Sequence, residues 1–215
     1  MKYGFKNVNH FKAVNGKQFD PKKLLEDNVI TIRCYYDLID GRHEHAGMSS
    51  LGGIGCTMSH YYLWKHCVDN NLPYIIITEE DNKFNDDIIS KDDEENILNA
   101  LSKDNGLFIG SFMHNFYTIP KFFGTQFCVI KNETCKILMD NCFPIDVQTD
   151  SYITHLVNMG YINLDGYRLT HQKSHPSSIQ DICVKCILPR KKIYYIIFVM
   201  FILLIFFLFI YYKCK

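Results

Sequence analysis

A single uninterrupted run of apolar and aromatic side chains, residues 193–212, constrains this chain more than any other feature. The run holds 20 residues and no charge. A helix of that length spans roughly 30 Å, the thickness of the hydrocarbon core of a bilayer. Basic residues flank the run and tyrosines mark both of its ends, as in the interfacial belts of membrane helices. We therefore predict one C-terminal transmembrane helix over residues 193–212, the alternative being a buried core helix.

The N-terminal residues indicate on which side of the membrane the rest of the chain lies. Residues 1–11 carry charge but lack the apolar segment that a signal peptide needs. We therefore expect residues 1–192 on the cytosolic side, as a single-pass protein anchored at its C-terminus. Residues 1–180 are expected to form the globular domain and residues 181–192 a juxtamembrane linker. The glycosylation sequon at Asn132 would then stay unused.

Composition narrows the class of protein. The first 192 residues suffice for one ordinary domain with its own core, and 47% hydrophobic residues exclude a disordered chain. Without Lys213 and Lys215, 21 basic residues face 23 acidic ones. Because a nucleic-acid binder usually shows a clustered basic excess, we expect no nucleic-acid partner. The nine cysteines have irregular spacing and are expected to be free thiols.

Apolar runs alternate with helical patterns along the chain, which predicts an α/β domain. Strands are predicted at residues 29–36, 74–78, 107–111 and 126–130. Helices are predicted at residues 59–68, 94–101, 134–141 and 147–159. The strand at residues 74–78 is continuously apolar, as in strands that are buried on both faces.

An acidic triplet, Glu79, Glu80 and Asp81, follows this strand directly. In open α/β sheets, ligands bind beyond the carboxyl ends of the strands, so carboxylates at that position face a site. Glu79 and Asp81 are two residues apart and would project to the same side of an extended chain. Two such oxygens suit a hard divalent cation that also binds a diphosphate. A solvated acidic loop would show the same pattern.

Several blocks in a fixed order carry a more specific signal. They are Phe11-Lys-Ala-Val-Asn-Gly16, Leu51-Gly-Gly-Ile-Gly-Cys-Thr-Met-Ser-His-Tyr-Tyr-Leu-Trp-Lys65, Ile75-Ile-Ile-Thr-Glu-Glu-Asp81, Gly124-Thr125 and Pro144-Ile-Asp-Val-Gln-Thr-Asp-Ser151. Together they closely resemble glycosyltransferase family 25, the lipopolysaccharide and procollagen-type galactosyltransferases. The resemblance spans about residues 11 to 179.

This resemblance implies a GT-A-like nucleotide-sugar-binding sheet with flanking helices, in which an acidic motif holds a divalent metal. Glu79 and Asp81 would be its metal ligands. Glu80 stands where the family has Asp, and the longer side chain favours Mn²⁺ over Mg²⁺, which demands a stricter octahedron.

Donor contacts are expected at Gly52, Gly55, Ser59, His60 and Gly124. The glycines would let the backbone approach the ligand, and a helix that begins near residues 56–59 would direct its N-terminus at phosphate. For Ser59 a helix cap is the alternative, and for His60 a packed core position. Trp64 is expected in the core.

An inverting transfer needs a carboxylate that takes the proton of the acceptor hydroxyl. Asp146 and Asp150 are four residues apart and share a face if the chain is helical there. One of them is the predicted catalytic base. Asp146 could instead cap the helix, and Asp150 could simply interact with its N-terminus.

The function expected from the resemblance is transfer of a hexose, galactose or glucose, from a UDP-sugar to a hydroxyl of a glycan, protein or lipid, with inversion. Family members carry a further strand before the first block, whereas here only ten residues precede Phe11. Either the true start lies upstream, or the sheet lacks this strand. The alternative function, which the second case favours, is a degenerate, non-catalytic, membrane-anchored binding or structural protein of the same fold.

Overall fold

The computed structural model describes residues 7–42, 44–85, 89–113, 122–172 and 198–201. Its centre is a four-stranded sheet in the order β1-β6-β3-β7. These strands are β1 (Tyr74–Thr78), β6 (Phe127–Lys131), β3 (Gly106–Ile109) and β7 (Asn163–Gly166). Both pairs that include β6 are antiparallel, and β3 pairs with β7 in parallel. The fold is therefore a mixed α/β fold with a small mixed sheet.

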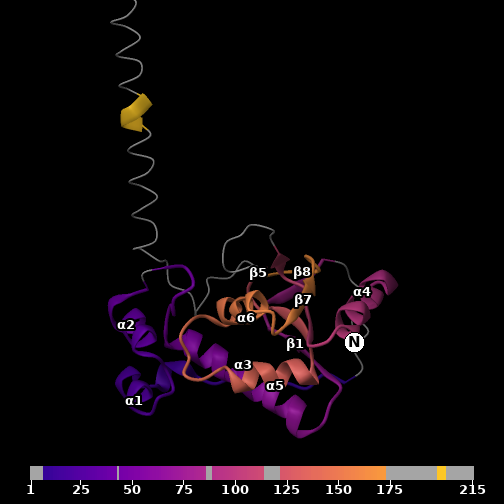
Figure 1. The fold of residues 1–215 in the computed structure, drawn as a ribbon, viewed down its shortest axis with the longest axis horizontal. Helices are drawn as coiled ribbons and strands as arrows, with labels where there is room; N and C mark the ends of the chain where they lie inside the picture. Colours follow the sequence, from indigo (N-terminus) through magenta and orange to yellow (C-terminus); the bar gives the residue numbers. More distant parts are fainter. Residues whose placement is uncertain (1–6, 43, 86–88, 114–121, 173–197, 202–215) are drawn as a thin grey trace, which may run out of the picture.

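The remaining elements are helices and short strand pairs around this sheet. The helices are η1 (Gly16–Gln18), α1 (Pro21–Glu26), α2 (Ile32–Asp40), α3 (Leu51–Asp69), α4 (Lys91–Ser102), α5 (Asn132–Asp140) and α6 (Thr149–Asn158). Two small sheets pair β2 (Asn82–Phe84) with β8 (Thr170–Gln172) and β4 (Phe112–Met113) with β5 (Phe122–Phe123). Figure 1 shows α3 and α5 side by side, with α4 at the opposite end of the molecule from α1 and α2.

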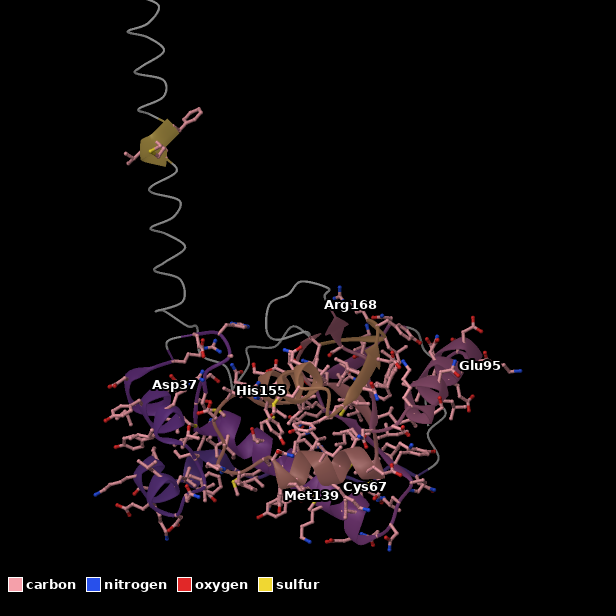
Figure 2. All side chains as sticks on the ribbon, in the orientation of Figure 1. Asp37, Cys67, Glu95, Met139, His155 and Arg168 are labelled. Carbon is pink, nitrogen blue, oxygen red and sulfur yellow. The ribbon has the colours of Figure 1, made fainter. Side chains whose placement is uncertain are left out.

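The side chains, drawn in Figure 2, form two hydrophobic cores, one on each face of the sheet. Alternate strand residues point to opposite faces, and Leu107 and Ile109 accordingly pack with Trp64 and Leu138 in the larger core beside α3 and α5. Phe108 points the other way, into a smaller core that includes Ala100 of α4, Phe127 and Val129. Trp64 is completely buried, which confirms its predicted core position.

Strand β1 matches its predicted residues but is not buried on both faces. It forms the edge of the sheet and pairs with β6. Ile77 packs into the larger core, whereas Tyr74 and Ile76 on the other face are 44% and 40% exposed. The small core on that face is built from other residues and does not extend to this edge.

The strand predicted at residues 29–36 was wrong. Only Ile30 makes a bridge there, to Ile145, and α2 begins two residues later. Thr31 is the N-cap of α2, because its hydroxyl accepts a hydrogen bond from the backbone N–H of Cys34 at 3.1 Å. A capping threonine outweighs the weak strand preference of β-branched and aromatic residues.

Helix α3 begins earlier than predicted, at Leu51, with Ser50 as its N-cap. The glycine cluster therefore lies inside the helix. Packing explains two of these glycines, because a Cβ at Gly53 would meet Met48 Sδ at 2.6 Å. A Cβ at Gly55 would meet the backbone N of Gly16 at the same distance. The helices predicted at residues 94–101, 134–141 and 147–159 correspond to α4, α5 and α6.

The predicted membrane helix and the linker before it lie outside the described residues, except for a helical segment at residues 198–201. Within the ranges that the structure describes, no helix is both long and apolar enough to cross a bilayer. The C-terminal anchor stays a prediction.

Candidate active site

The acidic triplet lies in a turn, so its residues do not continue the extended strand. The backbone N–H of Asn82 donates a hydrogen bond to the carbonyl of Glu79 at 3.1 Å. Glu79 and Asp81 therefore do not lie on one extended segment, and the prediction that they would was wrong. Because β1 and β6 are antiparallel, the end of β1 meets the start of β6, and the Glu79 N–H donates to the carbonyl of Gln126 at 2.9 Å.

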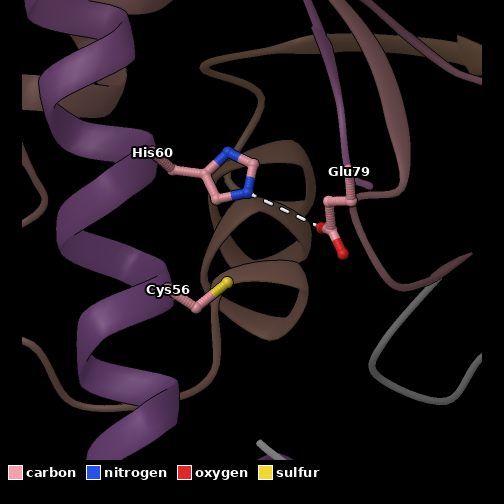
Figure 3. Close-up of side chains that lie close together, drawn as sticks. All are labelled: Cys56, His60 and Glu79. Carbon is pink, nitrogen blue, oxygen red and sulfur yellow. Dashed lines mark ion pairs between the residues drawn. The ribbon is translucent and has the colours of Figure 1, made fainter. Parts of the chain in front are cut away.

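The Glu79 side chain turns toward α3 (Figure 3). Its Oε1 accepts a hydrogen bond from the Thr125 hydroxyl at 2.7 Å and lies 3.8 Å from His60 Nε2. The same hydroxyl lies 3.1 Å from His60 Nε2. Cys56 stands one helical turn before His60, on the same face of α3. Four side chains thus meet between α3 and the start of β6.

Electrostatics couple this group of residues. Burial alone would lower the pKa of His60, but hydrogen bonds to Cys56 and Glu79 outweigh burial and raise it to about 10. Burial alone would raise the pKa of Glu79, but its hydrogen bonds with His60 and Thr125 outweigh burial and lower it. The two shifts have opposite directions, as in an imidazolium–carboxylate pair.

Asp150 lies in the first turn of α6 and is half-buried. Its Oδ2 accepts the backbone N–H of Gly124 at 3.2 Å, and its Oδ1 accepts that of Ser151 at 2.7 Å. Burial raises the pKa of Asp150, and these two hydrogen bonds and the charge of His45 offset that rise only in part. A carboxyl with a raised pKa can take a proton more readily than an ordinary aspartate.

Asp146 has different surroundings. It accepts hydrogen bonds from the Thr31 hydroxyl and, at 3.2 Å, from Arg33 Nη1. It does not cap α6, because the N-cap residue is Gln148. Asp146 therefore connects the segment before α6 to the beginning of α2, which the sequence alone did not indicate.

Gly124 and Thr125 join the two halves of the site. The Gly124 N–H contacts Asp150, and the next residue, Thr125, contacts Glu79 and His60. A second link is made between α3 and α6, where the hydroxyls of Thr57 and Thr149 lie 2.9 Å apart. The structure thus brings Asp150, Gly124, His60 and Glu79 into one continuous set of contacts.

Comparison with known proteins shows the family of this chain. Residues 5–174 match the family described as Glycosyltransferase family 25 (LPS biosynthesis protein). The chain belongs to glycosyltransferase family 25. A glycosyltransferase 25 family member of Drosophila melanogaster is 37% identical over 75 residues, and one of Anopheles gambiae is 33% identical over 78 residues. Human procollagen galactosyltransferase 2 is 32% identical over 73 residues.

These matches cover 34–36% of this family 25 chain and 11–12% of each relative. The chain therefore corresponds to a small part of the relatives' length. The family predicted from the ordered sequence blocks is confirmed.

Two residues that were predicted as donor contacts have packing roles in this family 25 chain. The Ser59 hydroxyl donates to the carbonyl of Gly55 at 2.7 Å and accepts the Val14 N–H at 2.8 Å, and the residue is buried. Gly55 allows residues 14–16 to approach α3 closely. Gly52 lies in the first turn of α3 and is half-buried. Donor binding at these three residues stays a prediction.

The Mn²⁺ that the family resemblance implies is not supported by the ligand set around Glu79. Hard cations prefer oxygen ligands, whereas the neighbours of Glu79 include a thiol and an imidazole besides the Thr125 hydroxyl. Among the described residues, the group of three side chains spaced for a metal ion consists of Cys56, His60 and Glu79, without Asp81. A manganese site at Glu79 and Asp81 stays a prediction.

Thr125 and Cys56 belong to the site but were not predicted as site residues from the sequence. No local pattern distinguishes Thr125, since its role arises from the pairing of β1 with β6. Cys56 could have been found, because its spacing of four residues from His60 places both on one face of a helix. The helix was predicted only over residues 59–68, so Cys56 was not placed on it together with His60.

Proposed function

We propose that this chain is a glycosyltransferase that moves a hexose from a UDP-sugar to a hydroxyl acceptor with inversion, and that Asp150 is its catalytic base. Family membership supports the reaction class. One observation carries the assignment of the base: Asp150 has a raised pKa, is half-buried and is held by the Gly124 N–H beside the acidic motif. Asp146 accepts hydrogen bonds from Thr31 and Arg33 and has a structural role.

In the proposed reaction the acceptor hydroxyl attacks the anomeric carbon of the donor, and the bond from that carbon to the diphosphate breaks. Asp150 takes the hydroxyl proton as the new glycosidic bond forms. The diphosphate leaves with the electron pair of the broken bond. Inversion follows because attack and departure occur on opposite faces of the sugar.

The hydrogen bonds from Gly124 and Ser151 orient the Asp150 carboxylate without neutralising it. A fixed orientation matters because a base must lie within hydrogen-bond reach of the proton that it removes. The Gly124 backbone is itself a proposed donor contact. The site would therefore couple donor binding to the position of the base.

We further propose that the sheet serves as a GT-A-like platform for the nucleotide and that donor binding requires Mn²⁺. The acceptor would be a hydroxyl of a glycan, protein or lipid, and the domain would act on the cytosolic side of a membrane. No step above depends on the metal.

The deciding experiment is a transfer assay with the 215-residue chain, purified in detergent. UDP-galactose and UDP-glucose are offered with manganese and a panel of hydroxyl acceptors, and inversion is read from the anomeric configuration of the product. We expect transfer that a chelator abolishes. Donor binding without transfer to any acceptor would favour the non-catalytic binding protein, and retention of configuration would exclude Asp150 as the base of a direct displacement.

A further inference from the structure

Cys56, His60 and Glu79 form a compact group that takes no part in the bond-making, bond-breaking or proton-transfer steps of the proposed reaction. One ligand atom of each side chain lies within 4.8 Å of the others. Two of the three come from consecutive turns of α3, and the third comes from the turn after β1 (Figure 3). A thiol, an imidazole and a carboxylate are the three ligand types that zinc sites combine.

We infer that Cys56, His60 and Glu79 bind one divalent ion of the zinc and cobalt class, with a fourth coordination position open. A thiolate and an imidazole select such borderline ions over manganese or magnesium. Three protein ligands with one open position are typical of zinc sites that admit water or another small ligand. This inference rests on the geometry of the three side chains and does not depend on sugar transfer.

The distances between the three ligand atoms would shorten only slightly when an ion binds. Tetrahedral zinc with bonds of about 2.0–2.3 Å places its ligand atoms roughly 3.3–3.8 Å apart. His60 Nε2 and Glu79 Oε1 are already 3.8 Å apart. Cys56 is half-buried, and the Glu79 side chain is 31% exposed. Both therefore reach the buried His60 ring from partly exposed positions.

The framework that holds the ligands is rigid. Helix α3 has 19 residues and packs against α5, and His60 itself is 4% exposed. Glu79 is fixed through its backbone N–H to Gln126 and through the Thr125 hydroxyl. Ligands held on packed elements lose little freedom when they bind an ion.

Charge balance also favours a divalent ion at this position. A bound thiolate and carboxylate carry two negative charges, and a divalent ion neutralises both. The bound group therefore has no net charge, so the cost of burying a net charge is avoided.

The first test is a Co²⁺ titration of the 215-residue chain in detergent, in the absence of any sugar donor. We expect a thiolate-to-cobalt charge-transfer absorption that saturates at about one equivalent and disappears when Zn²⁺ is added. Absence of this band in the unmodified protein would overturn the inference. Manganese should not produce the band, because a thiolate and an imidazole are poor ligands for it.

Variants identify the ligands. Cys56→Ser should lose the band, and His60→Gln and Glu79→Gln should weaken Co²⁺ affinity by at least about 10-fold. Cys142→Ser is the matched control, because Cys142 is a buried cysteine outside the group. Asp81→Ala should keep the band, because Asp81 is not part of the group. A band that survives in folded Cys56→Ser would overturn the assignment.

A second measurement needs no variant. Cys56 is the one partly buried thiol among the described cysteines, and the others are buried. Zn²⁺ should therefore protect Cys56 from alkylation in the unmodified protein, as read by peptide mass. Alkylation of Cys56 at the same rate with and without Zn²⁺ would exclude the site even if the Cys56→Ser protein failed to fold. Since neither measurement uses a donor sugar, their outcome is independent of the transfer assay.

Discussion

The backbone N–H of Gly124 donates a hydrogen bond to the carboxylate of Asp150 at 3.2 Å, across 26 residues of sequence. This contact joins the loop before β6 to the first turn of α6. The next residue after Gly124, Thr125, contacts Glu79, so the same loop meets the acidic motif. The proposed base and the acidic motif are thus positioned by one short segment.

Asp150→Asn should lower the turnover rate about 100-fold or more and leave donor affinity unchanged, because the amide keeps the size of the carboxylate but cannot take a proton. Ionised Asp150 is disfavoured in the folded state. Removal of this cost should stabilise the variant at neutral pH, but the amide keeps one acceptor oxygen for the N–H groups of Gly124 and Ser151, so the two effects should largely offset each other. Single-turnover transfer, donor calorimetry and urea unfolding separate these effects.

Asp146→Asn is the matched control for this prediction. It should leave turnover near normal and lower the free energy of unfolding by about 1 kcal/mol or less, since the ion pair with Arg33 is partly exposed. A large rate loss in Asp146→Asn, with full activity in Asp150→Asn, would instead identify Asp146 as the base. Normal turnover in both variants would exclude the pair from catalysis.

The pH dependence of kcat/KM should also report on Asp150. Since burial raises the pKa of this carboxyl, the acidic limb of the profile should have an apparent pKa above the ordinary value of about 3.9 for aspartate. Activity should be full at pH values above that limb and fall as the pH drops and Asp150 becomes protonated. An acidic limb at or below the ordinary value would contradict the assignment.

Gly124→Ala should lower turnover by moving the N–H that orients Asp150. Gly124 has a φ of +77°, and a Cβ there would meet the Gln126 side chain at 2.1 Å. The strain of an alanine at positive φ and the close contact with Gln126 should together lower the free energy of unfolding by about 1 kcal/mol or more. Gly160→Ala is the control, because Gly160 has a φ of +79° but no atom within 4 Å of an added Cβ. Equal rate losses in both variants would indicate a general loss of stability and not a displaced base.

Asp81→Ala should remove manganese-dependent donor binding with little loss of stability, if Asp81 holds the donor metal with Glu79. Calorimetry with a UDP-sugar, with and without manganese, measures this directly. Unchanged donor affinity in the variant would refute the manganese assignment. Because Asp81 lies outside the group of Cys56, His60 and Glu79, the variant separates the two proposed metals.

Asn132→Ala should lower the free energy of unfolding by about 1–3 kcal/mol. The Asn132 amide donates to the carbonyls of Cys67 at 3.1 Å and Leu72 at 2.8 Å, in a partly buried position. Asn141→Ala is the control, because its amide makes a similar bond to Ile137 but is exposed, so water can replace it. Comparable urea midpoints for the two variants would contradict this role. The same contacts should keep the sequon at Asn132 unglycosylated.

Local patterns in the sequence predicted much of the fold. The apolar strand at residues 74–78, the glycosyltransferase 25 family and the helices α4, α5 and α6 were all identified without coordinates. These features depend on side-chain periodicity and on the order of short blocks, both of which are present in the linear chain. The carboxylates of the proposed site were named for the same reason.

Only the tertiary structure decided how these pieces pair and which roles their residues take. Residues 29–36 have strand composition, but the Thr31 cap and packing beside Ile145 start a helix there. Asp146 and Asp150 are equivalent by spacing. They differ because Asp146 accepts hydrogen bonds from Thr31 and Arg33, whereas Asp150 is half-buried and accepts the Gly124 N–H. Such contacts join residues 26 to 115 positions apart. They depend on which surfaces the core brings together, and local periodicity carries no information about that.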